Sequence, residues 1–166
     1  MALRVARTVA LAGGAPALWL AALALEGIAG GLVTWLAGPH GPALLGTAAN
    51  LFIAWRFTAT LRPGAVPLIT RYARHDPAGL PPRAERYTRR LTAAWAILLG
   101  LFALAHAATL AGLWPLRAVS LTEAALCTAG FLSEHLLRSR LFPELGRATP
   151  WRTVSAIRAA GLPHAG

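Results

Sequence analysis

Several polar side chains interrupt the long apolar runs of this chain, among them Glu26, Asn50 and Arg56. A charged or amide group inside a hydrocarbon layer has to be protonated, paired or turned towards a polar cavity, so such residues are functional candidates. Glu26 lies at mid-depth in its run, where a hydrogen bond to Asn50 or Arg56 on another helix competes with a role in transport or proton relay. Arg56 lies about one turn from the end of its run, from where its guanidinium can reach lipid phosphates.

A second group of side chains that could bind anions lies between Leu61 and Trp95. Seven of the sixteen arginines fall in this stretch, and the chain has no lysine. Lipid phosphates are the default ligand for basic residues beside apolar segments, and an acidic protein surface is the alternative. Nucleic acid is not expected, because no recognised nucleic-acid-binding motif accompanies the arginines. The candidate binding residues are Arg71, Arg74, Arg83, Arg86, Arg89 and Arg90.

The other residues that could carry chemistry do not assemble a catalytic or metal site. His106 and His135 differ in predicted depth by about 18 Å, which excludes a shared haem or metal ion. Cys127 is the only cysteine, so an intrachain disulfide and a cysteine metal cluster are both excluded. His75 and Asp76 are adjacent in a turn, and no nucleophile follows at a useful spacing. We therefore expect no enzyme activity, no cofactor and no metal.

The elements that position these residues are predicted from an apolar chain. Hydrophobic residues make up 56% of it, charged residues 13%, and mean hydropathy is +0.53, whereas a soluble domain carries about 25% charged residues. Four segments have the roughly 17 to 25 residues that span a hydrocarbon core. The pattern predicts an all-α fold, a polytopic transmembrane helix bundle of about four spans in a single membrane domain. The predicted spans are residues 15–37, 42–60, 92–113 and 118–137.

The N-terminal boundary has two interpretations. We prefer a first span at residues 15–37, separated by Gly13 and Pro16 from a short interfacial helix. In the alternative, residues 8–25 span the membrane and residues 27–37 form a re-entrant piece. The basic start and apolar continuation also fit a signal peptide, but the apolar character continues well beyond the conceivable cleavage region, which favours retention.

The distribution of arginines orients these spans. With both termini in the cytoplasm, the loop at residues 61–91 and the tail at residues 138–166 lie inside, and Arg117 alone lies outside. This asymmetry satisfies the positive-inside rule. The nearly uncharged turn at residues 38–42 is typical of a short outer connection. We therefore predict a multi-pass protein with a basic cytoplasmic loop.

Proline and threonine mark three further helices beside the membrane surface. Pro67 can begin a short helix, and Pro82 can begin a longer one that runs unbroken into the third span. In the tail, Thr149 is suited to the N-cap and Pro150 to the first helical position, with Gly161 ending the helix. The short helices are expected to lie in the interface.

Two acidic residues of the last span have expected surroundings. Glu134 and Arg138 are spaced i, i+4, which favours a pair worth a few tenths of a kcal/mol. Glu123 lies near the outer end, where it faces water or pairs with Arg117.

Several short motifs follow one another between residues 61 and 138: Leu61-Arg62-Pro63, Pro67-Leu68-Ile69, Leu80-Pro81-Pro82, Tyr87-Thr88-Arg89-Arg90-Leu91-Thr92, Trp95 and Ser133-Glu134-His135-Leu136-Leu137-Arg138. With these motifs the segment resembles a family of small bacterial inner-membrane proteins. The family is encoded beside genes for fatty-acid-like and aryl-polyene biosynthesis, with acyl carrier proteins, ketosynthases and acyltransferases as neighbours. The chain departs from the family pattern at Ser133 and His135, where Gly and Tyr are expected.

The resemblance implies an accessory or scaffold protein in the bacterial inner membrane. Its partners would be membrane lipids and acyl carrier protein or biosynthetic enzymes, docked electrostatically at the cytoplasmic loop, because carrier proteins are acidic. The alternative is a small transporter or flippase subunit that uses Glu26, Asn50 and Arg56 within the helix bundle.

Overall fold

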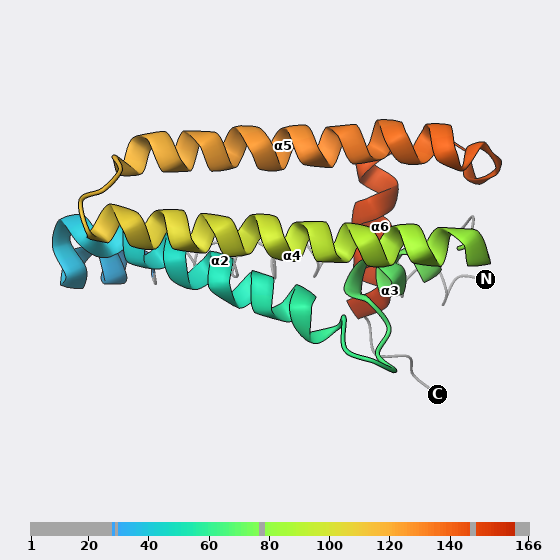
Figure 1. The fold of residues 1–166 in the computed structure, drawn as a ribbon, viewed down its shortest axis with the longest axis horizontal. Coiled ribbons are helices and arrows are strands. Elements are labelled where there is room, and N and C mark those ends of the chain that lie inside the picture. Colours follow the sequence, from blue (N-terminus) through green and yellow to red (C-terminus); the bar gives the residue numbers. More distant parts are fainter. Residues whose placement is uncertain (1–27, 29, 77–78, 147–148, 162–166) are drawn as a thin grey trace, which may run out of the picture. The chain divides into compact units, whose positions relative to one another are not determined.

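The computed structural model describes residues 28, 30–76, 79–146 and 149–161. The described chain is all-α, as predicted, and it divides into two compact units, Met1–Leu45 and Gly46–Gly166 (Figure 1). Two short 3-10 helices, η1 (Gly38–His40) and η2 (Pro143–Leu145), accompany five α-helices. The α-helices are α2 (Gly41–Ala59), α3 (Leu68–Arg74), α4 (Pro82–Leu110), α5 (Leu116–Leu141) and α6 (Pro150–Gly161).

The first unit contains the turn predicted between the first two spans. Residues 30–37 are helical, η1 follows, and α2 begins at Gly41. A Cβ on Gly41 would lie only 2.5 Å from the Cα of Thr34, so a side chain there would collide with the preceding helix. Most of the predicted first span, including Glu26, lies outside the described residues.

Threonines join α3 to α4 in the second unit. Thr70 and Thr88 share a hydrogen bond of 2.7 Å between their hydroxyls, and both side chains are buried. Thr92 accepts a hydrogen bond from the backbone N–H of Ile69 and donates to the carbonyl of Thr88. Helix α3 follows Pro67, and α4 starts at Pro82 and continues without a break, both as predicted. The basic loop is therefore a packed helical layer.

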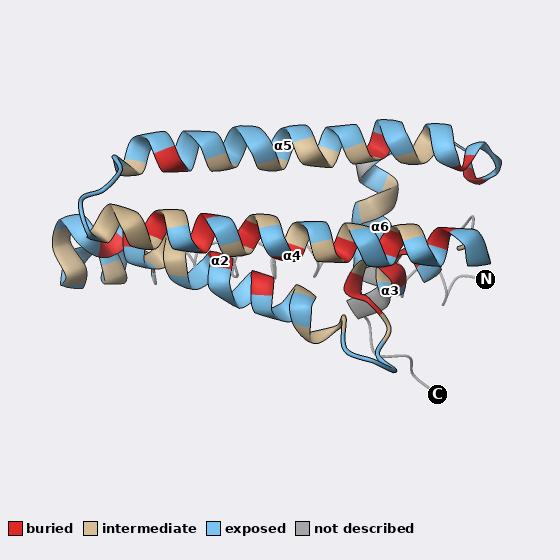
Figure 2. Cartoon of the chain, viewed as in Figure 1, coloured by how far each residue is buried: buried red, intermediate tan, exposed pale blue. Residues whose placement is uncertain are grey.

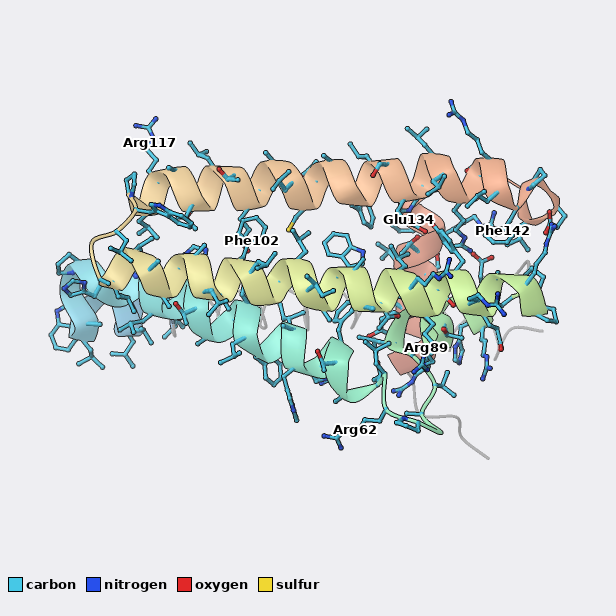
Figure 3. The ribbon with its side chains drawn as sticks, viewed as in Figure 1. Arg62, Arg89, Phe102, Arg117, Glu134 and Phe142 are labelled. Carbon is cyan, nitrogen blue, oxygen red and sulfur yellow. The ribbon has the colours of Figure 1, made fainter. Side chains whose placement is uncertain are left out.

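Helices α4 and α5 form a hairpin whose turn contains Gly112 at φ +70° and Pro115 just before α5. Buried positions recur along α4, whereas on α5 only Val119 and His135 are buried (Figure 2). Phe102 of α4 is buried and lies between the two helices (Figure 3). Most of α5 is therefore available to surroundings outside this chain.

Among the described helices, α4 alone is both long and apolar enough to cross a membrane. In the other two long helices no continuous stretch of this length is apolar enough, because Asn50 and Arg56 interrupt α2 and Glu123 interrupts α5. On α4, large apolar side chains face outward at Ile97, Leu101 and Leu104, which are 65%, 58% and 68% exposed. The membrane prediction is thus supported at the level of one helix, and the four-span arrangement remains a prediction.

The C-terminal helix begins as predicted. Thr149 accepts a hydrogen bond of 3.3 Å from the backbone N–H of Arg152, which is the expected N-cap contact, and α6 starts at Pro150. Between α5 and α6, Phe142 and Leu145 pack against Ala84 of α4. Figure 1 shows α6 at the same end of the α4–α5 hairpin as α3.

Candidate functional site

A chain of buried polar side chains joins α2, α4 and α5. Asn50 Nδ2 donates to Glu123 Oε1 at 2.9 Å, and Glu123 Oε2 lies 2.6 Å from His106 Nε2. The side chain of His106 is 4% exposed and that of Glu123 25% exposed. Asn50 Nδ2 also donates to the carbonyl of Gly46 at 3.0 Å, so its amide is held from two sides. We call Asn50, Glu123 and His106 the polar triad.

His106 and Glu123 share one hydrogen bond whose direction depends on the tautomer of the imidazole. His106 Nδ1 is buried and has no hydrogen-bond partner among the described residues. A neutral imidazole with its lone pair on Nδ1 tolerates this position best, because an unpaired N–H would be costly to bury. In this tautomer Nε2 carries the proton and donates it to Glu123.

The small size of residue 46 allows the imidazole of His106 to lie where it does. A Cβ on Gly46 would be 2.6 Å from Nδ1 and 2.7 Å from Cγ and Cε1 of His106. Helix α2 therefore approaches α4 closely at this level. The carbonyl of Gly46 accepts a hydrogen bond from Asn50, and the absence of a side chain at Gly46 leaves room for the imidazole of His106.

The expectation for Glu123 was wrong. It neither faces water nor pairs with Arg117, but turns inward to Asn50 and His106. The sequence could have indicated this contact, because Asn50 and Glu123 lie at similar distances, roughly 10 to 14 Å at 1.5 Å per residue, from the N-terminal ends of their helices. Glu26, the other predicted partner of Asn50, lies outside the described residues.

An ion cluster forms at the other end of α5. Asp76, which follows α3 and whose side chain is 3% exposed, accepts hydrogen bonds from Arg138 of α5 at 3.0 Å and from Arg152 of α6 at 2.5 Å. Arg152 also donates to the carbonyl of Leu145 at 2.9 Å. We call Asp76, Arg138 and Arg152 the ion cluster. One buried carboxylate thus connects three elements.

The ion cluster also corrects the predicted pair of Glu134 and Arg138. Arg138 reaches Asp76 instead, because a hydrogen bond to a buried carboxylate is stronger than an exposed pair of i, i+4 neighbours on a helix. Glu134 lies 3.2 Å from Nδ1 of His135. His135 Nε2 contacts Thr153 Oγ1 of α6 at 3.0 Å.

All six predicted anion-binding arginines are exposed, but they fall into two groups. Three are engaged within the chain: Arg74 pairs with Glu85 at 2.6 Å, Arg83 with Glu144, and Arg89 donates to the carbonyl of Leu61 at 2.6 Å. For the other three, the described residues supply no side-chain hydrogen bond or ion pair. These are Arg71 on α3 and Arg86 and Arg90 on α4, which we call the open arginines.

Two further arginines lie outside these groups. Figure 3 shows Arg117 near the α4–α5 turn. Arg56, a predicted intramembrane candidate, is exposed on the last turn of α2. Its exposure fits contact with lipid phosphates. No cluster of three or more metal-binding side chains occurs in the described part of the chain.

Comparisons with protein families, with curated proteins and with solved structures found no match for this chain. The resemblance to the inner-membrane family therefore stays a hypothesis. The features of the described chain that bear on function are the open arginines, the polar triad and the exposed apolar faces.

Proposed function

We propose that this chain is a multi-pass protein of the bacterial inner membrane and acts there as a non-enzymatic scaffold. In this proposal its cytoplasmic surface docks an acidic protein of acyl-carrier-dependent biosynthesis, with acyl carrier protein as the first candidate. The observation that carries the proposal is the exposure of the open arginines Arg71, Arg86 and Arg90, for which the described residues supply no partner.

The geometry of the open arginines supports a protein partner. Arg86 and Arg90 are one helical turn apart on α4, so their guanidinium groups lie on the same side of the helix. Arg71 belongs to α3, which the threonines hold against α4. Fixed cations with free donors steer an acidic partner during encounter and fix its orientation. An unstructured basic loop would steer the partner less well and would not fix its orientation.

The exposed apolar faces support the membrane placement. On α2, Leu51, Phe52 and Trp55 are each more than half exposed, and α5 exposes Leu121 and Leu136 in the same way. A protein surrounded by water rarely carries apolar surface of this extent, whereas contact with lipid requires it. We infer that α2 and α5 span beside α4, with Asn50 of α2 and Glu123 of α5 turned into the bundle.

In-cell photo-crosslinking tests the docking surface. A photoreactive residue at Arg86 should capture acyl carrier protein, and the same residue at Arg117, on the opposite side of the membrane, should not. Arg71→Gln combined with Arg90→Gln should reduce capture at position 86 by about tenfold or more, because each lost charge pair weakens steering and binding. Capture of lipid alone, or equal capture at both positions, would contradict docking.

A second candidate function, proton-linked transport, is favoured by the polar triad. A buried histidine bonded to a carboxylate between helices is the kind of group that proton pathways use. This candidate retains Asn50 from the sequence prediction and replaces Arg56 by Glu123 and His106. The alternative to transport is a purely structural role, in which the hydrogen bonds of the polar triad fix the packing of the helices.

Proton uptake into liposomes that carry the protein separates these two roles of the triad. Transport predicts proton uptake driven by a potassium diffusion potential, lost in Glu123→Gln and retained in Glu85→Gln, which removes an exposed carboxylate. No uptake above that of protein-free liposomes would leave the triad with a packing role.

A further inference from the structure

A groove of about 740 Å³ runs between α4 and α5 on the half of the hairpin that carries the arginine-rich layer. Trp95 and Leu98 of α4 and Leu137 of α5 are among its apolar lining residues. A Cβ on Gly130 would lie 3.8 Å from the indole of Trp95. Because glycine has no side chain, the groove stays open between these two residues. The volume falls in the range of about 300 to 1,000 Å³ that is usual for ligand sites.

The length of the groove matches one leaflet of a membrane. From Arg90 to Leu98 the lining residues of α4 cover about 12 Å, and from Arg140 to Gly130 those of α5 cover about 15 Å, at 1.5 Å per residue. Half of a hydrocarbon core is also about 15 Å. An acyl chain that enters at the arginine-rich end would therefore be covered along most of its depth.

Two cations lie at the entrance to the groove. Arg90 and Arg140 both line it and are exposed, and the described residues provide no ion pair for either guanidinium. Glu134 lines the same end, but its side chain is 12% exposed and lies 3.2 Å from His135 Nδ1 (Figure 3). Two free guanidinium groups therefore outweigh one largely covered carboxylate. This charge arrangement complements a phosphate.

We propose that the groove binds one anionic phospholipid of the cytoplasmic leaflet, with an acyl chain against Trp95 and Leu98 and the phosphate between Arg90 and Arg140. The inference rests on the proposed membrane placement but not on docking of a carrier protein. The lipid fills the space that α4 and α5 leave open between them, so it acts as a resident part of the bundle.

Photoactivatable lipids test this site in the full-length protein reconstituted in phosphatidylcholine nanodiscs. A phosphatidylglycerol probe with its reactive group in the acyl chain should label peptides that contain Trp95 and Gly130. Gly130→Leu should reduce this labelling by about tenfold, because the new side chain occupies the groove. The matched control is Gly100→Leu, which places the same side chain on α4 where a Cβ meets no atom within 4 Å.

Charge specificity needs a second comparison. Arg140→Gln should lower labelling by the phosphatidylglycerol probe about tenfold and leave labelling by a phosphatidylcholine probe unchanged. Equal labelling in the two leucine variants, or equal labelling by both probes, would mean annular lipid only and would overturn the proposal. Ser133→Trp, at another lining position, replaces Gly130→Leu if that variant does not fold. Neither Gly130 nor Arg140 belongs to the open arginines, so carrier docking should survive both changes.

Discussion

Gly46 lies against the imidazole of His106 so closely that a Cβ at position 46 would be 2.6 Å from Nδ1. The contact joins α2 to α4 at the level of the polar triad, and the carbonyl of Gly46 also accepts from Asn50. A single missing side chain thus lets three helices converge on Glu123.

Gly46→Ala should destabilise the protein by about 1–3 kcal/mol, because the added methyl group pushes His106 away from Glu123. Thermal unfolding in detergent, followed by tryptophan fluorescence, measures the change. The control is Gly100→Ala, where a Cβ meets no atom within 4 Å and only the small gain in helix propensity is expected. Equal unfolding temperatures for native protein and Gly46→Ala would mean that α2 and α4 do not approach as described.

Replacing the central carboxylate should weaken both hydrogen bonds of the triad. Glu123→Gln keeps the size of the side chain but removes the charge, so we expect a loss of about 1–3 kcal/mol. The same experiment on Asn50→Leu should give a loss of similar size, and the double variant should lose less than the sum, because both changes remove one shared hydrogen bond. Strictly additive losses would argue against the contact.

The ion cluster should hold α6 in place. Asp76→Asn removes the buried carboxylate that Arg138 and Arg152 both contact, and a loss of about 3 kcal/mol is expected for breaking a buried pair. Hydrogen exchange should quicken in α6 more than in α4. Glu85→Gln breaks the exposed pair with Arg74 and should cost at most about 1 kcal/mol. Equal losses of stability in Asp76→Asn and Glu85→Gln would mean that burial does not strengthen the contribution of Asp76.

Glu144 should make stability depend on pH. The hydrogen bond from Arg83 lowers the pKa of the Glu144 carboxyl. Stability from this pair is therefore fully present above the unfolded pKa of about 4.3 and is lost as pH falls through the lower folded pKa. The native protein should melt slightly above Glu144→Gln at pH 7, and the difference should vanish in acid. A difference that grows on acidification would contradict this sign.

The native cysteine offers a route to the topology. In a Cys127→Ala background, Arg117→Cys should react with a membrane-impermeant maleimide in intact spheroplasts. Arg62→Cys should react only after the membrane is opened. Labelling of both positions from outside would overturn the proposed orientation and the multi-pass arrangement with it.

The helix starts were accessible from the sequence because proline and threonine act locally. Pro67, Pro82 and Thr149 with Pro150 each mark a start that the structure reproduces. The partner of Glu123 was not predicted, because it depends on how α2, α4 and α5 rotate about their axes. The role of Asp76 was missed for a similar reason, since Arg152 reaches it only after η2 has turned the chain back towards α3.

Binding of purified acyl carrier protein to the protein in phosphatidylcholine nanodiscs is the most direct test of the scaffold proposal. Saturable binding should weaken with salt and fall about tenfold or more when the three open arginines, Arg71, Arg86 and Arg90, are changed to Gln. The matched variant carries Gln at Arg74, Arg83 and Arg89, which are engaged within the chain, and should bind nearly as well as native protein. Absence of saturable binding, or equal loss in both triple variants, would contradict docking through the open arginines.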